Sequence, residues 1–119
     1  MRYFTAFGAL ALLGSALCAQ PVNPLGGKWT VDLSVDPSKP YTKAMVLNLA
    51  TDGAVTGSFY DSAIQAGRWK NDRGRTCVSF RTTDGASPYH TSACLRGGMV
   101  EGQTWAEHRS FLFNWTAKR

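Results

Sequence analysis

A run of hydroxyl side chains between Thr56 and Ser62 is the part of this 119-residue sequence best suited to binding chemistry. The run follows the turn dipeptide Asp52-Gly53. Because side chains alternate faces along a strand, one face is predicted to carry Thr56, Ser58, Tyr60, Ser62 and Ile64. Hydroxyls both donate and accept hydrogen bonds, so this face suits the polar head of a ligand inside a small barrel. A solvent-facing row on a half-exposed strand is the alternative.

Cys77 and Cys94 are expected to form a disulfide. They are equidistant from the centre of the turn Asp84-Gly85-Ala86-Ser87, so an antiparallel hairpin with that register places them opposite each other. A metal site would need more ligands than two sulfurs at this spacing, and we expect no metal. With the apolar Val78 and Phe80 turned inward, the register predicts the interior residues Thr76, Val78, Phe80, Thr82, Tyr89, Thr91, Ala93 and Leu95.

Catalytic patterns are missing from the sequence. His90 and His108 are the only histidines, and neither lies in a metal-binding or triad motif. Glu101 and Glu107 are the only glutamates, which leaves little for a hydrolase that uses paired carboxylates. We therefore expect a protein that is not an enzyme and needs no cofactor.

The elements that position these residues are predicted to be short strands, because apolar residues alternate with polar ones between turn signals. Eight such ranges follow one another, and that number closes an antiparallel up-and-down barrel around one small ligand. An open β-sandwich is the alternative fold. The ranges are 28–35, 43–50, 54–64, 66–71, 75–83, 88–96, 99–106 and 110–118.

Residues 1–19 are predicted to be a secretory signal peptide, with Arg2 before an apolar run and small residues at the end. Residues 20–119 then form one domain, secreted or periplasmic, with no membrane span. Leu17 before Cys18 disfavours lipidation of that cysteine. The net charge of +5 becomes +4 without Arg2, and the basic residues form no dense stripe, so no nucleic-acid partner is expected.

The segment from Thr56 to Ile64 resembles the avidin/streptavidin family, whose Thr-Gly-x-Tyr-x-Ser-Ala strand binds the ureido group of biotin. The resemblance places the family's Tyr and Ser at Tyr60 and Ser62, with one extra residue before the tyrosine. Gly27-Lys28-Trp29 resembles the Gly-x-Trp pattern of calycin barrels, in which the tryptophan plugs one end.

The resemblance extends at low identity through the later strands. It implies ligand contacts from Phe80, Thr91 and Trp105, and from Asn114 on the last strand, where Phe113 is the alternative inward residue. Val31 stands where the family has the Asn that bonds the ureido oxygen, and the loop 107–109 is too short for the family's further Trp. Biotin binding is therefore expected to be micromolar or weaker.

The strand pattern and the resemblance together predict a small-ligand-binding barrel for biotin or a biotin-like polar heterocycle. A protein-binding barrel, such as the small periplasmic metalloprotease inhibitors, is the alternative, with the segment 20–25 entering the enzyme. Apolar residues on both faces of the strands 43–50 and 110–118 favour a homodimer. A monomer with scattered exposed apolar residues is the other possibility.

Overall fold

The computed structural model describes residues 23–119, and the predicted leader with Cys18 lies outside them. Residues 23–119 form nine antiparallel strands and one 3-10 turn, η1. The strands are β1 (Gly27–Asp32), β2 (Thr42–Leu49), β3 (Ala54–Phe59), β4 (Ser62–Ala63), β5 (Gln65–Asp72), β6 (Arg75–Thr83), β7 (Pro88–Arg96), β8 (Met99–Ala106) and β9 (Phe111–Lys118), with η1 at Glu107–Arg109.

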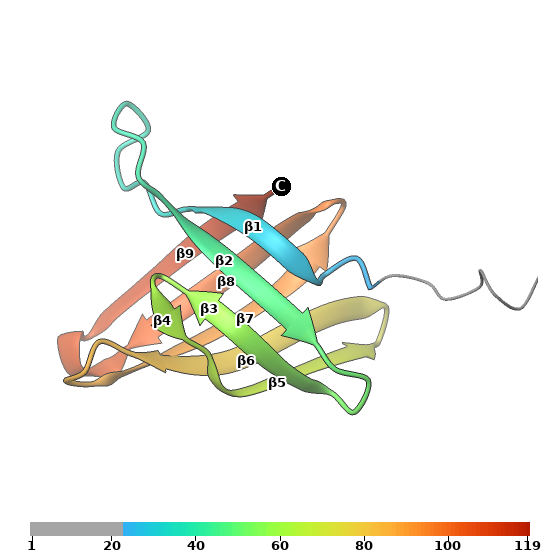
Figure 1. Cartoon of the computed structure of the whole chain (residues 1–119). Coiled ribbons are helices and arrows are strands. Elements are labelled where there is room, and N and C mark those ends of the chain that lie inside the picture. Colours follow the sequence, from blue (N-terminus) through green and yellow to red (C-terminus); the bar gives the residue numbers. More distant parts are fainter. Residues whose placement is uncertain (1–22) are drawn as a thin grey trace, which may run out of the picture.

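Eight of these strands close into an up-and-down barrel, which confirms the predicted fold class. Each strand pairs with its neighbour in sequence, and β1 pairs with both β2 and β9 to close the ring. The two-residue β4 is an extra arm that pairs only with the end of β3. Figure 1 shows the closed ring and the loop between β1 and β2 that projects from one end. No helix within residues 23–119 is long and apolar enough to cross a membrane.

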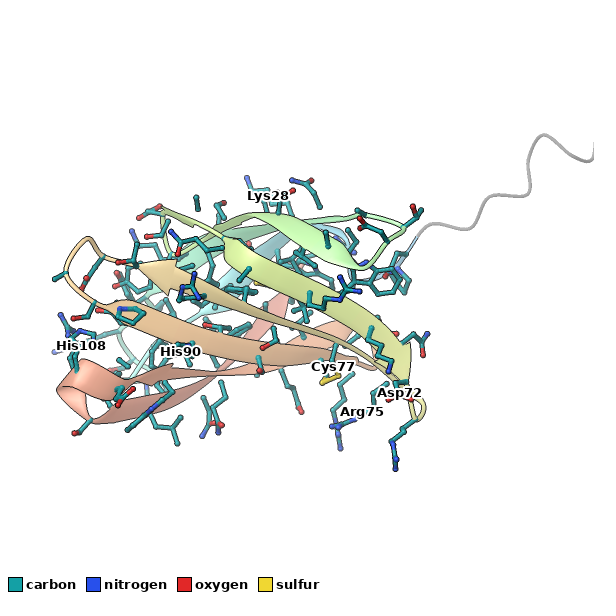
Figure 2. All side chains as sticks on the ribbon, turned by 90° about the horizontal axis from the view of Figure 1, so that it is seen from below. Lys28, Asp72, Arg75, Cys77, His90 and His108 are labelled. Carbon is teal, nitrogen blue, oxygen red and sulfur yellow. A yellow bond between two sulfur atoms is a disulfide. The ribbon has the colours of Figure 1, made fainter. Side chains whose placement is uncertain are left out.

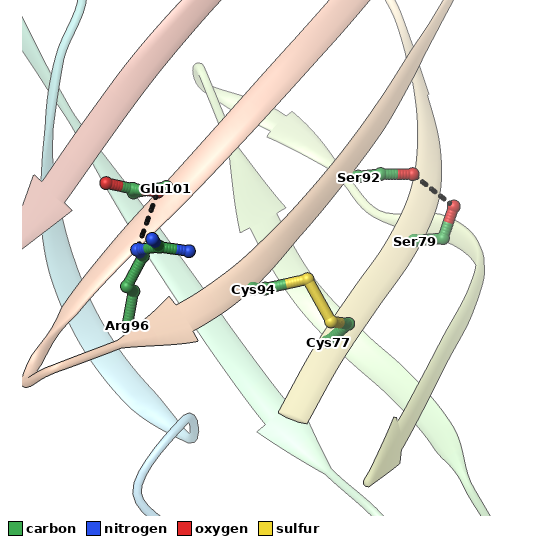
Figure 3. The surroundings of a disulfide bond; sticks show 6 residues. All are labelled: Cys77, Ser79, Ser92, Cys94, Arg96 and Glu101. Carbon is green, nitrogen blue, oxygen red and sulfur yellow. Dashed lines mark hydrogen bonds and ion pairs between the residues drawn. A yellow bond between two sulfur atoms is a disulfide. The ribbon is translucent and has the colours of Figure 1, made fainter. Parts of the chain in front are cut away.

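The hairpin β6–β7 has the predicted register and the predicted disulfide. Cys77 pairs with Cys94 across the two strands, and their sulfur atoms are bonded. The disulfide lies on the outer face, beside Ser79 and Ser92 (Figure 3). The opposite face buries Val78, Phe80 and Ala93, as the alternation requires. The interior of this half of the barrel was therefore predictable from two cysteines and a turn.

One end of the barrel is closed by contacts between the two ends of the chain. The Trp29 side chain is fully buried there, and its indole N–H donates to the Leu25 carbonyl oxygen at 2.9 Å. The Arg119 guanidinium lies 4.0 Å from the centre of the Trp29 ring and donates to the carbonyl oxygens of Pro24 and Gly26. Trp29 thus lies where a barrel plug was predicted.

Aromatic rings fill the middle of the barrel. Phe59 packs against Phe80 and Trp115 at centroid distances of 5.5 Å and 5.2 Å. Gly102 pairs with Trp115 across β8 and β9, and a Cβ on Gly102 would collide with the indole. A glycine is therefore needed where the tryptophan crosses the neighbouring strand.

The prediction of one continuous strand from residue 54 to 64 was wrong. Tyr60 and Asp61 have φ angles of 53° and 62° and form a two-residue turn between β3 and β4. This left-handed pair matches a primed hairpin turn, which follows the twist of the strands. Because the turn follows Phe59, β3 places Val55 and Phe59 inside the barrel and leaves Thr56 exposed. The hydroxyls therefore do not form one row on the inner face of a single strand.

Candidate functional site

The open end of the barrel contains a cavity of about 740 Å³, which we call the mouth cavity. It lies at the end opposite to the Trp29 plug, among the β1–β2 loop, the Tyr60–Asp61 turn, the β6–β7 loop and the η1 segment. Figure 2 shows His108 at this end and Asp72 with Arg75 at the other. Six aromatic residues line the mouth cavity among aliphatic and polar ones. The residues used below are Tyr41, Phe59, Tyr60, Ser62, Thr82, Asp84, Tyr89, Thr104, Arg109, Phe111 and Phe113.

Two tyrosines form one side of the mouth. The Tyr41 and Tyr60 hydroxyls share a hydrogen bond of 2.6 Å. The Lys43 ammonium lies 5.4 Å from the centre of the Tyr60 ring and forms a 2.7 Å ion pair with Asp61. The hydrogen bond with Tyr41, together with partial burial, raises the pKa of Tyr60. Tyr60 is therefore a neutral phenol at physiological pH, held in place by its neighbours.

The β6–β7 loop forms the opposite side and contains an anchored carboxylate. Asp84 accepts hydrogen bonds from the backbone N–H groups of Ala86 and Ser87 and from the Tyr89 hydroxyl, at 2.9–3.0 Å. These bonds, the two backbone ones first, lower the pKa of Asp84 from 3.8 to about 2. The bond to Asp84 also raises the pKa of Tyr89. The Tyr89 ring meets the His108 ring edge to face at 5.3 Å.

The floor of the cavity combines apolar rings with threonine hydroxyls. Phe59 and Phe113 supply the rings, and Phe113 stacks on Phe111 at 5.2 Å toward the rim. The Thr104 hydroxyl accepts a hydrogen bond from the Trp115 indole at 3.0 Å. Thr82 is only 4% exposed, and its hydroxyl has no hydrogen-bond partner among residues 23–119. A buried hydroxyl without a partner is costly unless water or a ligand bonds it.

Below this floor the barrel is filled, which corrects two predicted ligand contacts. Phe80 is 4% exposed and packs on Phe59, whereas Thr91 is 1% exposed and shares a 2.9 Å hydrogen bond with Thr104. Both point inward, as predicted, but neither lines the mouth cavity. The sequence pattern could not show this, because it gives the direction of a side chain and not the depth to which the barrel is filled.

Trp105 is on the outside of the barrel, so its predicted role inside it was wrong, whereas Asn114 lies at the rim of the mouth cavity although its strand position faces outward. Trp105 is 40% exposed on the outer face of β8, which turns Val100, Thr104 and Ala106 inward. The Asn114 side chain accepts a 2.7 Å hydrogen bond from Gln103 on the same outer face. Phe113 is the inward residue of this pair, as the apolar face of the last strand indicates.

Tyr60 and Ser62 do lie at the mouth cavity, although the turn and not the strand places them there. The Ser62 hydroxyl donates to the Thr83 carbonyl oxygen at 3.0 Å, so it is already engaged. Tyr41 and Arg109 were not predicted to line a cavity. Thr82 and Tyr89 were placed inside by the hairpin register, but only the position of the mouth singles them out.

Across residues 23–119, no three His, Cys, Asp or Glu side chains are grouped so as to bind a metal ion. The mouth cavity offers aromatic walls, neutral hydroxyls and a few rim charges, an arrangement suited to reversible binding.

In the comparisons with known proteins, no family model, no curated protein and no solved structure matches this chain.

Proposed function

We propose that this barrel binds a small organic ligand in the mouth cavity without chemical change. The observation that carries the proposal is the cavity of about 740 Å³ with the buried Thr82 hydroxyl at its floor, which has no hydrogen-bond partner within residues 23–119. Aromatic walls with a few polar groups are typical of small-molecule sites, where the polar groups orient the ligand. A flat ligand with an apolar ring and a hydrogen-bonding edge fits the Phe59, Phe113 and Thr82 surfaces best.

Biotin or a biotin-like heterocycle is the named candidate, through the resemblance at Tyr60 and Ser62. Several features limit its affinity. Val31 is fully buried beside Ala117 and cannot donate to a ureido oxygen, and the hydroxyls of Tyr60 and Ser62 already have partners. We propose at most micromolar affinity for biotin and expect an unrelated aromatic ligand to bind at least as well.

The test is a fluorescence titration with biotin and with the dye 8-anilinonaphthalene-1-sulfonate, together with native mass spectrometry for a retained ligand. We expect one dye molecule per chain. The variant Ser62→Phe fills the cavity wall and should weaken dye binding at least about tenfold, or 1.4 kcal/mol. Thr116→Phe adds the same ring to the exposed face of β9 and serves as the control. Equal binding by both variants would exclude the mouth cavity.

Export and dimerisation belong to the same proposal. A disulfide is typical of oxidising compartments and favours a location outside the reducing cytoplasm, so we propose a secreted or periplasmic protein.

Leu112 is 51% exposed on the outer face of β9 and is the strongest support for a homodimer. Sedimentation at micromolar concentration tests this: Leu112→Ser should yield single chains, and a wild-type protein that is already monomeric would reject the dimer.

A protein-binding function has one supporting observation. The segment that would enter a protease is fixed where it reaches the barrel, because Leu25 is buried and Arg119 holds the Pro24 carbonyl oxygen. Such anchoring would stiffen an inserted arm; residues 20–22 of the arm lie outside the described chain. Deleting residues 20–23 should abolish inhibition of a metalloprotease panel under this alternative and leave dye binding intact under the first.

A further inference from the structure

A second concave surface lies on the outside of the barrel, across β5 to β8, well separated from the mouth cavity. We call it the outer groove; its volume is about 490 Å³, and the residues used here are Arg68, Ser79, Arg81, Ser92, Gln103 and Trp105. All six are exposed.

Strand register arranges these side chains in two parallel rows. Arg68 pairs with Ser79, Ser79 with Ser92, and Ser92 with Gln103, which makes one row of polar groups across four strands. In the next row, Arg81 pairs with His90 and His90 with Trp105. Directly paired side chains are about 5 Å apart, so each row is a continuous strip. Figure 3 shows Ser79 and Ser92 side by side on this face.

The groove is positively charged without an internal counter-charge. Arg68 and Arg81 take part in none of the ion pairs formed among residues 23–119, and no Asp or Glu lines the groove. Arg81 donates to the neutral Gln65 side chain, at 3.2 Å. A guanidinium binds a carboxylate through paired hydrogen bonds, so two of them in one groove favour an anionic ligand.

Trp105 supplies a flat apolar surface at the edge of the groove. Its side chain is 40% exposed, although an outward-facing position on a strand is usually polar. An indole combines a broad apolar face with one N–H donor and is favoured where a ligand has both apolar and polar faces. Trp105 pairs across strands with His90, which pairs with Arg81, and on its other side with Leu112. The groove is therefore a site of the single chain, and a dimer that covers Leu112 would compete with ligand for Trp105.

The backbone offers this groove few free donors. Strands β6, β7 and β8 each have a partner on both sides, so their N–H groups are used in the ladder. Phosphate sites usually depend on free backbone N–H groups at a loop or helix start. Recognition here must come from hydroxyl, amide, indole and guanidinium side chains, which suits a ligand with many hydroxyls and spaced carboxylates.

From these observations we propose that the outer groove binds an acidic oligosaccharide, a chain of sugar rings bearing carboxylates. The apolar face of one ring stacks on Trp105, the sugar hydroxyls bond Ser92 and Gln103, and carboxylates pair with Arg68 and Arg81. This site is independent of the mouth cavity, because its side chains point away from the barrel interior.

The experiment is isothermal titration of the full chain with a galacturonate hexamer, the same hexamer methyl-esterified at its carboxyls, and an oligonucleotide of equal charge. The free-acid hexamer should bind in the micromolar range, and the ester, which keeps the sugar rings and hydroxyls but lacks the carboxylate charges, should bind at least about tenfold more weakly. Arg81→Gln and Trp105→Ala should each weaken binding about tenfold. Arg75→Gln, at the exposed β5–β6 turn, is the matched charge control and should bind within about twofold of wild type.

Trp105 also supplies a direct readout, since its indole N–H resonance should shift on addition of the free-acid hexamer while that of the buried Trp29 does not. Equal affinity for the ester would overturn the charge argument. Tighter binding of the oligonucleotide, or a Trp105→Ala variant that binds like wild type, would overturn the assignment to a sugar. Dye binding at the mouth is unaffected in each case, so failure here is distinguishable from failure of the proposed function.

Discussion

Two threonines in the barrel carry the same hydroxyl in different surroundings. Thr91 shares its hydrogen bond with Thr104 inside the packed layer, whereas Thr82 lines the mouth cavity without a partner among residues 23–119. Both are almost completely buried. The difference separates a hydroxyl that stabilises the fold from one that is available to a ligand.

Replacing each threonine by valine should therefore have opposite consequences. Thr91→Val should lower the free energy of unfolding by about 1–2 kcal/mol, because it leaves Thr104 with one hydrogen bond fewer. Thr82→Val should leave stability unchanged or raise it by about 1 kcal/mol, and should weaken ligand binding instead. Urea denaturation and the dye titration measure both. Equal destabilisation by the two variants would mean that Thr82 is bonded in the native protein.

The two incorrect predictions for single residues, the continuous strand through Tyr60 and the inward Trp105, have physical causes. Tyr60 and Asp61 adopt positive φ angles without any glycine to signal the turn, and the alternation of faces is interrupted there. For Trp105, the sequence of its own strand indicates an outward side chain. Val100, Thr104 and Ala106 alternate with polar residues and mark the inner face of β8. The family resemblance placed Trp105 inside the barrel, whereas the alternation places it outside, and the exposed Trp105 side chain agrees with the alternation.

At the scale of single elements, the β6–β7 loop depends on one carboxylate. Asp84 holds two backbone N–H groups and the Tyr89 hydroxyl, which couples the loop to the wall of the mouth cavity. All three bonds favour the ionised form, and this lowers its pKa to about 2.

Acid should loosen this loop only at very low pH. Because the folded-state pKa is depressed, the stabilisation by Asp84 is complete above its ordinary value of 3.8 and is lost as pH falls through about 2. Asp84→Asn removes that dependence, so stability should fall less between pH 4 and pH 2 in the variant than in wild type. The carboxyl carbon of Asp84, followed by NMR, should titrate near 2. A midpoint near 3.8 would contradict the three hydrogen bonds.

The disulfide should stabilise the same hairpin from its other end. Cys77 and Cys94 are 17 positions apart, and closing a loop of that size restricts the unfolded chain by about 3 kcal/mol. The double variant Cys77→Ala/Cys94→Ala should lose about that much in urea denaturation while keeping the barrel. Unchanged stability after full reduction would show that the pair contributes nothing to it.

Strand positions were the most predictable elements. The ranges 75–83, 88–96 and 99–106 match β6, β7 and β8 at both ends. Turns containing glycine bound β6 and β7 on both sides and mark the start of β8. The loop between β1 and β2 was less predictable: it begins at residue 33, although the apolar alternation continues to Val35. Val35 is 94% exposed, so alternation alone did not reveal where pairing ends.

At the scale of the whole molecule, the barrel has one closed end and one open end. Arg119 joins the last strand to the first by donating to three carbonyl oxygens and stacking on Trp29. This contact spans 95 positions in sequence, and no local pattern predicts it.

Removing that side chain should weaken the closed end without changing the mouth. Arg119→Ala should lower the free energy of unfolding by about 2 kcal/mol through lost charged hydrogen bonds and the cation–π contact. Lys118→Ala removes a neighbouring exposed charge and should have little effect. Hydrogen exchange at the Trp29 indole should accelerate in the arginine variant alone. Equal effects of the two variants would mean that the Arg119 hydrogen bonds and its contact with Trp29 do not stabilise the closed end.

Because the first and last described residues of the barrel meet at the plugged end, the molecule has a built-in polarity for display. Attachment to a bead, a sensor surface or a fused carrier through the first or the last of these residues therefore fixes the protein at its plugged end. The mouth cavity then faces the solution, whichever of the two residues is used.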